Sequence, residues 1–190
     1  MEGEKYLFVV SGPSGVGKDS VMSRLRQAHP EIEKTISATT RAPREGEKEG
    51  VNYYYRTKEQ FLQMLEQGEI LESNHFNGNY YGTLRSEVEK RMAAGKLTLL
   101  NIDIHGAANI KRLYPGSTSI FLLPPSFDTL EARLRGRGTD SEANIRQRLA
   151  IAQEELRCAD AFDLKIVNDD IGRAAEELYD VMIRRSGLSL

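Results

Sequence analysis

The sequence has few of the residues that build disulfide frameworks, metal clusters and membrane spans. Its 190 residues include one cysteine, Cys158, three histidines and no tryptophan. A single cysteine excludes an internal disulfide and a cysteine-based metal site, and it favours a reducing compartment. No apolar run approaches the roughly 18 residues that a membrane span requires. The first residues include acids and lead directly into an apolar run, unlike a secretory signal. We therefore expect a cytoplasmic protein without a membrane partner.

An excess of charge of one sign is also missing. The formal net charge is −2, which argues against bulk binding of nucleic acid and leaves room for local basic patches. The hydrophobic content of 39% and the charged content of 28% are ordinary for a soluble globular chain. A chain of this length predicts one domain, 1–190, with inserted subdomains. Whether it is a monomer or a homo-oligomer stays open at this stage.

Four apolar runs predict the strands of a buried sheet. They cover residues 6–10, 97–104, 118–124 and 164–168. Continuous apolar runs are typical of strands that are buried on both faces, as in a parallel sheet. Helical patterns alternate with them, which predicts an α/β fold. One helix is expected to start at a capping box, Ser86–Glu89, and to end at Gly95. The last helix, near 171–184, has an apolar stripe: Ile171, Ala174, Ala175, Leu178, Val181 and Met182.

Two segments interrupt this alternation. Residues 37–84 contain a second capping box, Thr57–Gln60, and two short strands around a turn at Gly78, which predicts a small α+β lobe. Residues 129–153 are rich in arginine and end in a helix. Its inward side is expected to carry Ile145, Leu149, Ala152 and Leu156. The remaining segments, 1–36, 85–128 and 154–190, are expected to form the core.

A glycine-rich loop follows the first expected strand. Residues Gly12 to Lys18, "GPSGVGK", satisfy the pattern G-x-x-x-x-G-K, and a helical pattern comes next. The glycines allow successive backbone N–H groups to face a bound anion, and the start of the helix adds partial positive charge. Lys18 can reach the β- and γ-phosphates of a nucleotide. The sequence therefore predicts a phosphate-binding loop.

Asp19 stands where such a loop normally has a hydroxyl residue or glycine. A negative charge ~4 Å from a phosphate charge costs about 4 kcal/mol at an effective dielectric of ~20. In the first turn of a helix an acid gains only ~0.3–1 kcal/mol from the helix dipole. Two arrangements satisfy this limit. Asp19 can point away, with Ser20 supplying the hydroxyl, or Mg²⁺ can lie between Asp19 and the phosphates, directly or through water.

The lobe 37–84 concentrates residues suited to a second phosphate and a base. Arg41 and Arg44 bracket a proline and form a fork that fits a phosphate. Carboxylates accept well from the paired N–H donors on one edge of guanine. Taken alone, the arginines can also be a solvated basic patch and the acids ordinary surface residues. The candidates in this group are Ser37, Arg41, Arg44, Tyr53, Glu72, Tyr81 and Thr83, with Asp103 at the end of an expected strand.

These segments together resemble the guanylate kinase family of nucleoside monophosphate kinases. The segments "SGPSGVGK", "SATTRAPREGEKEGVNYYY", "GNYYGT", "IDIHGA", "LRGRGTDSEANIRQRL" and "IVNDD" occur in family order and span nearly the whole chain. The resemblance implies a P-loop three-layer core with a parallel sheet, a GMP-binding lobe at 37–84 and a helical lid at 129–153. It also implies reversible, Mg²⁺-dependent transfer of the γ-phosphate of ATP to GMP or dGMP, in purine nucleotide metabolism.

The resemblance assigns roles to individual positions. Arg41, Arg44, Tyr53 and Tyr81 would hold the phosphate of GMP, and Ser37, Glu72, Thr83 and Asp103 would contact its guanine. ATP would be bound by Gly12, Pro13, Ser14, Gly15, Val16, Gly17, Lys18, Asp19 and Ser20, with Asn168 near the adenine. The catalytic cations would be Lys18, Arg41 and the lid residues Arg133, Arg137 and Arg148. Either Ser20 or Asp19 would face Mg²⁺.

Three positions depart from the family pattern, and two other functions stay open. Asp19-Ser20 replaces the usual loop residues, Asn101 stands where an acid is common, and His105 replaces a frequent glutamine. A ribose 1,5-bisphosphate phosphokinase of the phosphonate pathway also tends to carry "GKDS" and an asparagine near position 101, but it needs no residues that read guanine. A non-catalytic guanylate-kinase-like module would typically lack the loop lysine or the lid arginines.

Overall fold

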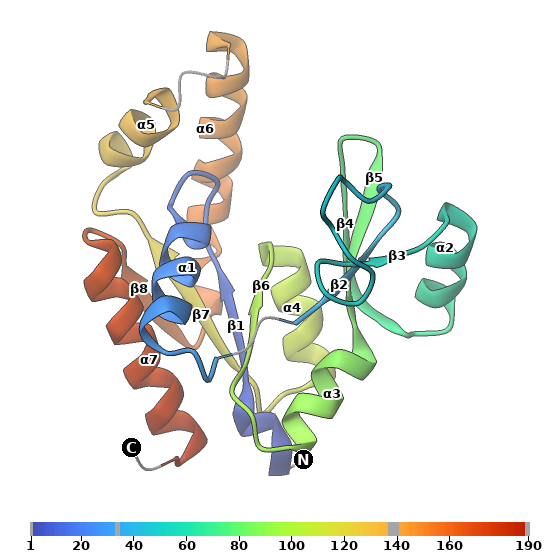
Figure 1. The fold of residues 1–190 in the computed structure, drawn as a ribbon. Coiled ribbons are helices and arrows are strands. Elements are labelled where there is room, and N and C mark those ends of the chain that lie inside the picture. Colours follow the sequence, from blue (N-terminus) through green and yellow to red (C-terminus); the bar gives the residue numbers. More distant parts are fainter. Residues whose placement is uncertain (1, 33–34, 137–140, 189–190) are drawn as a thin grey trace.

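A sheet of four parallel strands forms the centre of the fold. The computed structural model describes residues 2–32, 35–136 and 141–188. The strand order is β6-β1-β7-β8, and every pair of neighbours is parallel. The strands are β1 (Leu7–Ser11), β6 (Thr98–Asn101), β7 (Thr118–Leu123) and β8 (Leu164–Val167). Each overlaps one of the four apolar runs, so the predicted parallel sheet is confirmed (Figure 1).

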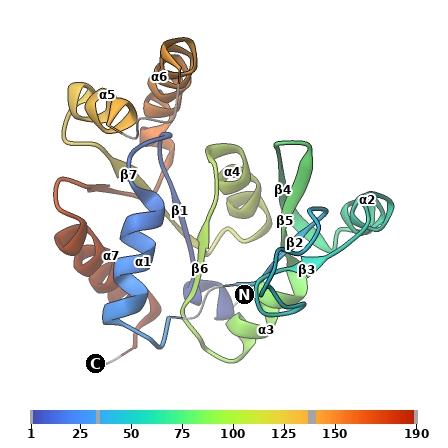
Figure 2. The same cartoon turned by 45° about the horizontal axis from the view of Figure 1, so that its top comes forward.

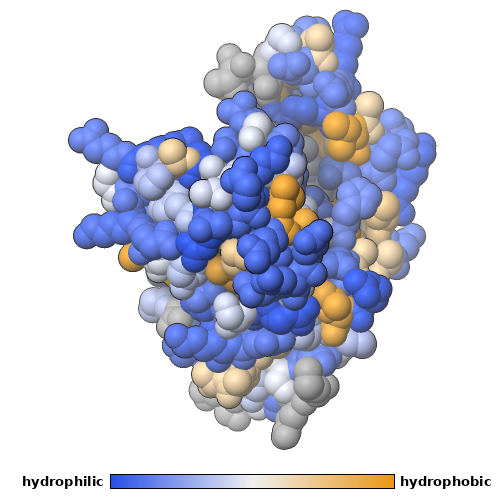
Figure 3. Space-filling model, turned by 90° about the vertical axis from the view of Figure 1, so that its right-hand side faces the viewer, coloured by the Kyte–Doolittle hydropathy of each residue, from blue (hydrophilic) through white to orange (hydrophobic). Residues whose placement is uncertain are grey.

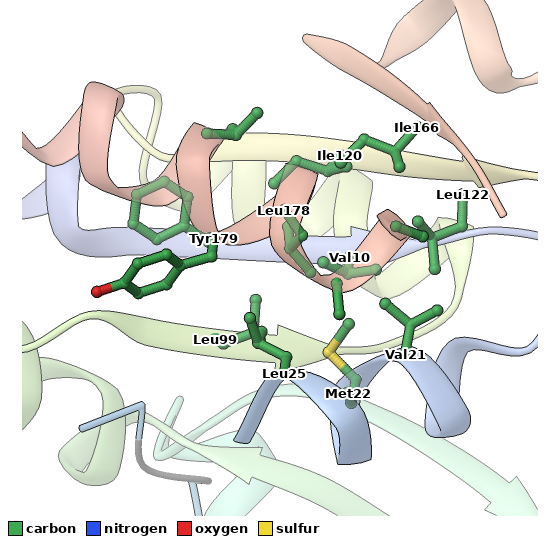
Figure 4. Close-up of a cluster of buried hydrophobic side chains, with 14 of the residues drawn as sticks. Val10, Val21, Met22, Leu25, Leu99, Ile120, Leu122, Ile166, Leu178 and Tyr179 are labelled. Carbon is green, nitrogen blue, oxygen red and sulfur yellow. The ribbon is translucent and has the colours of Figure 1, made fainter. Parts of the chain in front are cut away.

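Helices cover both faces of this sheet, because successive side chains of a strand point to opposite faces. Phe8 and Val10 of β1 belong to a hydrophobic cluster with α1 (Lys18–Ala28) and α7 (Ile171–Ser186) (Figure 4). Leu7 and Val9 belong to a second cluster with α3 (Arg85–Ala93) and α4 (Ile104–Leu113). The result is the predicted three-layer core, with the short η1 helix (Glu2–Tyr6) before β1.

The contact between α1 and α7 confirms most of the apolar stripe predicted for the last helix. Val21, Met22 and Leu25 of α1 pack against the stripe of α7 in one cluster. Ile171 is an exception, because it is the first residue of α7 and is 43% exposed. His29 caps the C-terminal end of α1, and its ring stacks on that of Tyr179 with centroids 3.5 Å apart.

A second, smaller sheet lies beside the core. Its strand order is β3-β2-β5-β4, with β2 parallel to β3 and antiparallel to β5. The strands are β2 (Ser37–Thr39), β3 (Tyr54–Tyr55), β4 (Ile70–Phe76) and β5 (Asn79–Leu84). Helix α2 (Lys58–Glu66) contributes Phe61 to a small cluster with Ala38, Ile70 and Leu84. Helices α5 (Phe127–Arg135) and α6 (Glu142–Arg157) project from the opposite side of the core, followed by η2 (Ala159–Ala161) (Figure 2).

Two of the three predicted helix signals form as expected. Thr57 and Gln60 make both bonds of a capping box at the start of α2. Gly95 ends α3, since its φ is +67° and Lys96 N donates to Arg91 O at 3.0 Å. The capping box at Ser86–Glu89 is wrong. Strand β5 continues directly into α3, the N-cap residue is Leu84, and Ser86 therefore already lies inside the first turn.

The outer face of the smaller sheet and α2 is largely hydrophilic. Figure 3 shows hydrophobic side chains there in small separate groups. The strongly exposed ones in this part of the chain include Val51 and, at the tip of the β4–β5 hairpin, Phe76. Among the residues that the structure describes, no helix has both the length and the apolar composition needed to cross a membrane.

Candidate active site

A cavity of about 660 Å³ separates the core sheet from the smaller sheet. The glycine-rich loop and the start of α1 contribute Gly12, Ser14, Lys18 and Asp19 to its lining. The end of β6 and the residues after it contribute Asn101 and Asp103. The lining also includes Ser37, Tyr53, Glu72, Tyr81 and Thr83 from the smaller sheet and its loops, and Glu155 from α6. Many of the residues predicted for two different ligands therefore line one cavity.

The loop before α1 adopts a backbone that requires glycine. Gly12, Gly15 and Gly17 have φ values of +147°, +89° and +98°. A Cβ atom at Gly12 would lie 2.6 Å from the Leu122 carbonyl oxygen, and one at Gly15 would lie 2.7 Å from Leu134 Cδ2. The turn is thus packed closely against β7 and α5. Helix α1 begins at Lys18, directly after the loop, as the phosphate-binding pattern predicts.

Lys18 is held against the loop. Its Nζ donates to the Gly12 carbonyl and lies 3.4 Å from the Pro13 carbonyl. Burial lowers the pKa of Lys18, while the negative charges of Glu155, Asp19 and Asp103 oppose that shift. The ammonium group thus lies against the backbone of the loop whose N–H groups would contact a phosphate.

Asp19 is linked to a second unusual residue. Its Oδ1 accepts from Asn101 Nδ2 at 2.8 Å, and both residues line the cavity. Two of the three departures from the family pattern are therefore in direct contact. Ser20 is the other residue predicted to face the metal. It follows Asp19 in α1, and its side chain is exposed.

Arg41 is fixed by a carboxylate that sequence reasoning missed. Its Nη2 donates to both oxygens of Glu47, at 2.9 and 3.0 Å, and its guanidinium lies 5.4 Å from the centroid of the Tyr53 ring. Glu47 also accepts from Arg44 N at 2.8 Å and from the Tyr55 hydroxyl at 2.9 Å. These bonds, with that from Arg41 the strongest, hold the pKa of Glu47 at about 2. The Arg44 side chain is exposed, and neither arginine is part of the cavity lining itself.

The side chain of Glu72, on β4, lies between Thr83 of the neighbouring strand and Gly106 of α4. The Thr83 hydroxyl donates to its Oε1 at 2.5 Å, and a Cβ atom at Gly106 would lie 3.1 Å from its Oε2. Burial raises the pKa of Glu72, the Thr83 bond opposes this, and Asp103 adds to the increase. Ser37 pairs with Thr83 in register. Three of the four residues expected to contact guanine are thereby adjacent.

The fourth residue, Asp103, also has a structural role. It is the N-cap of α4, where its Oδ1 accepts from Gly106 N at 2.8 Å. Its Oδ2 accepts from Asn74 Nδ2 at 3.3 Å, which joins the end of β6 to the hairpin of the smaller sheet. The spacing of Asp103 and Gly106 is typical of a capping aspartate.

Two residues predicted to contact ATP hold the glycine-rich loop in this structure. Arg133 donates to the Val16 carbonyl at 3.2 Å and to the Asn168 carbonyl at 2.9 Å. Asn168 is 1% exposed, and its Nδ2 donates to the same Val16 carbonyl at 2.7 Å. Its Oδ1 is buried and has no hydrogen-bond partner among the described residues. Both side chains therefore fix the loop to β8 and α5.

Helix α6 contacts the same loop at Ser14. Arg148 donates to the Ser14 hydroxyl from Nε at 3.2 Å and from Nη2 at 2.9 Å. Glu155 accepts from the Ser14 backbone N–H at 3.1 Å. Sequence reasoning missed Glu155, although it lies seven residues after Arg148 and therefore on the same side of a helix. The predicted lid residue Arg137 lies outside the described residues.

Comparison with known proteins gives a consistent result. The family model for guanylate kinase matches residues 4–185. The guanylate kinase of Trichormus variabilis is 51% identical over 172 residues, which cover 90% of this chain and 86% of that protein. The guanylate kinase of a Synechocystis species is 49% identical over 176 residues, covering 93% of this chain and 92% of its own length.

A solved structure agrees with these relatives. The crystal structure of guanylate kinase from Anaplasma phagocytophilum aligns with a TM-score of 0.72 and 35% identity, and the alignment covers 95% of this chain and 85% of that one. The fold, the matched residues and the relatives all agree with the resemblance found in the sequence. The chain therefore belongs to the guanylate kinase family and is a kinase of the ATP:GMP phosphotransferase class.

Proposed function

We propose that the cavity binds ATP and GMP together and transfers the γ-phosphoryl group of ATP to GMP. The observation that carries this proposal is the lining of one cavity by the glycine-rich loop on one side and by Glu72, Thr83 and Ser37 on the other. Phosphoryl transfer requires little covalent chemistry from the protein. It requires two substrates held in line and cations that stabilise the spreading charge.

On the donor side, we assign the phosphates of ATP to the loop from Gly12 to Ser20. Lys18 would stabilise charge on the transferring group, together with Arg133, Arg137 and Arg148 of the lid, 129–153. Asn168 would lie near the adenine, at the point where its side chain holds the Val16 carbonyl of the loop. No residue acts as a nucleophile. An oxygen of the GMP phosphate forms the new bond to the γ-phosphorus as the bond to ADP breaks.

On the acceptor side, we assign GMP to the lobe 37–84. Glu72 and Asp103 would accept from the N–H groups of guanine, with Ser37 and Thr83 beside them. The phosphate would bind Arg41, Arg44, Tyr53 and Tyr81, with Arg41 pre-oriented by the bonds from its Nη2 to both oxygens of Glu47. Both the lobe and the lid would close over the substrates and exclude water, which would otherwise hydrolyse ATP.

The donor atoms near the loop fit Mg²⁺. Magnesium prefers oxygen ligands and keeps several of its waters, and Asp19, Asn101 and Ser20 offer a carboxylate, an amide oxygen and a hydroxyl. When bound, Mg²⁺ would neutralise charge on the β- and γ-phosphates. No group of three or more His, Cys, Asp or Glu is arranged to hold a metal within the described ranges. We therefore infer that the ion enters with ATP. We further propose that the chain is a cytoplasmic enzyme of purine nucleotide metabolism, as membership of the family implies.

A coupled assay for ADP formation tests this function. GMP, AMP, UMP and ribose 1,5-bisphosphate are each offered with ATP and Mg²⁺, and we expect ADP formation that depends on GMP. Preferential turnover of ribose 1,5-bisphosphate would assign the chain to the related sugar kinase. Absence of turnover with all four acceptors would favour a non-catalytic binding module.

A further inference from the structure

Helix α6 holds Ser14 of the loop by two different groups. The Ser14 backbone N–H donates to Glu155 Oε2 at 3.1 Å, across 141 positions of the chain. The Ser14 hydroxyl accepts from Arg148 at 2.9 and 3.2 Å. Residues seven apart lie on the same side of a helix, so one side of α6 supplies both contacts. The lining of the cavity includes both Ser14 and Glu155.

The chemistry of the Glu155 contact resembles that of a bound phosphate. Backbone N–H groups of such a loop bind anionic oxygen atoms, and a carboxylate oxygen is an acceptor of the same kind. Glu155 is also close enough to Lys18 for its negative charge to oppose the fall in the pKa of that lysine. An anion of the protein itself is thus bound to one donor of the loop and lies near another.

A phosphate on the loop and the Glu155 carboxylate compete for these donors. Ser14 has a single N–H, and it is directed at Glu155. Two negative groups close to one another and to a single ammonium group also repel each other strongly in a partly buried site. The carboxylate must therefore give up the Ser14 N–H when a phosphate takes it.

We propose that Glu155 is an affinity-determining residue of the donor site, an internal anion that occupies the Ser14 N–H until a phosphate of ATP displaces it. This inference rests on the proposed binding of ATP at the loop. The displacement lowers the apparent affinity for ATP and frees the end of α6 from the loop when ATP arrives. Because Arg148 lies on the same helix and donates to the same serine, the displacement also changes the surroundings of Arg148.

Isothermal titration with ATP, in the absence of GMP, tests the proposal. Glu155→Gln keeps the size of the side chain and removes its charge, so we expect ATP to bind roughly tenfold more tightly, as for the loss of one charge-assisted competitor. The control is Glu154→Gln. Glu154 is the neighbouring residue, is 68% exposed and pairs with Arg157, and its variant should bind ATP like the wild type. Unchanged or weaker binding by Glu155→Gln overturns the proposal.

Two further measurements keep the result decisive. Glu155→Asp retains the charge but shortens the side chain by one methylene, so it should also bind ATP more tightly than the wild type, by a smaller factor. If Glu155→Gln does not fold, an unchanged or weaker affinity of the Asp variant is the overturning result. Failure of the wild type to bind ATP, or equal binding by Lys18→Ala, would instead contradict the donor site itself.

Discussion

Glu72 combines two opposite influences on its proton. Burial raises the pKa of its carboxyl group, and the bond from Thr83 at 2.5 Å lowers it. Because the net shift is upward, the ionised form is disfavoured by the folded protein, and protonation begins at a higher pH than for an ordinary glutamate. Only the ionised carboxylate can accept from both N–H groups of guanine with both oxygens.

We therefore expect the affinity for GMP to fall as the pH drops through the raised pKa of Glu72. The measurement is KM for GMP between pH 4.5 and 8, with KM for ATP as the internal reference. Glu72→Gln should raise KM for GMP by about tenfold or more and remove this part of the pH dependence, since one acceptor becomes a donor. Equal losses of affinity for ATP and GMP would contradict this role.

The contact between Asp19 and Asn101 predicts how the Mg²⁺ requirement depends on both residues. Asp19→Gly removes the carboxylate that follows the loop in the first turn of α1, so the Mg²⁺ concentration for half-maximal turnover should rise several-fold. Asn101→Asp in the same variant should restore it. In the wild type, Asn101 Nδ2 lies 2.8 Å from Asp19 Oδ1, so a carboxylate at position 101 would return a negative charge to that place. Titration of ADP with and without Mg²⁺ provides a readout besides turnover.

The outcome for Asp19 is informative in either direction. If Asp19→Gly and the double variant with Asn101→Asp both keep the wild-type Mg²⁺ dependence, Asp19 serves only as the acidic residue in the first turn of α1. In that case the hydroxyl of Ser20 becomes the better candidate for the metal. Asn101→Asp alone is the control, because it should place two carboxylates beside each other and weaken ATP binding in the absence of Mg²⁺.

At the scale of elements, the smaller sheet depends on one glycine. A Cβ atom at Gly82 would lie 2.7 Å from Ile70 Cγ2, 2.9 Å from Phe61 Cζ and 3.1 Å from the Glu72 carbonyl oxygen. These atoms come from β4 and α2, so Gly82 allows the hairpin and the helix to pack against each other. An added methyl group has no space there unless the Ile70 and Phe61 side chains are displaced.

Gly82→Ala should therefore destabilise the chain by about 1–3 kcal/mol, the usual cost of overpacking. KM for GMP should rise more than KM for ATP, because the displaced residues adjoin Glu72 and the loop lies on the other sheet. Urea unfolding and steady-state kinetics measure the two effects. Ser73→Ala is the matched control, since Ser73 pairs with Gly82 in register and is exposed. Wild-type stability of Gly82→Ala would contradict the packing argument.

Local patterns predicted the elements better than the contacts between them. The four core strands were visible because burial on both faces leaves continuous apolar runs. The capping box at Ser86 failed because β5 enters α3 without a loop, a fact that depends on the sheet. Glu47 and Glu155 were missed for a related reason. Glu47 contacts Arg41 only because the loop between them folds back on itself. Glu155 of α6 contacts Ser14, which lies 141 positions earlier in the chain.

At the scale of the whole molecule, the cavity lies between the core sheet and the smaller sheet, and the proposed transfer brings the substrates of the two parts together. The loop that we assign to ATP follows β1 of the core sheet, whereas Glu72 of β4 and Thr83 of β5 belong to the smaller sheet. Figure 2 shows β4 and β5 beside the core. An oxygen of GMP must reach the γ-phosphorus to within about 3–3.5 Å. Water must also be kept out of a site that holds ATP. Closure of the smaller sheet and of α5 and α6 over the core satisfies both requirements.

We expect the radius of gyration to decrease when ADP and GMP bind together, toward the roughly 16 Å of a compact chain of this length. Either nucleotide alone should give a smaller decrease, because each contacts only one of the moving parts and the core. Small-angle X-ray scattering measures the change, and ADP with AMP is the control pair. Adenine lacks the paired N–H donors of guanine that we assign to Glu72 and Asp103. An unchanged radius of gyration with ADP and GMP would contradict closure and mean that transfer occurs in the open arrangement. Side chains within the cavity would then have to exclude water.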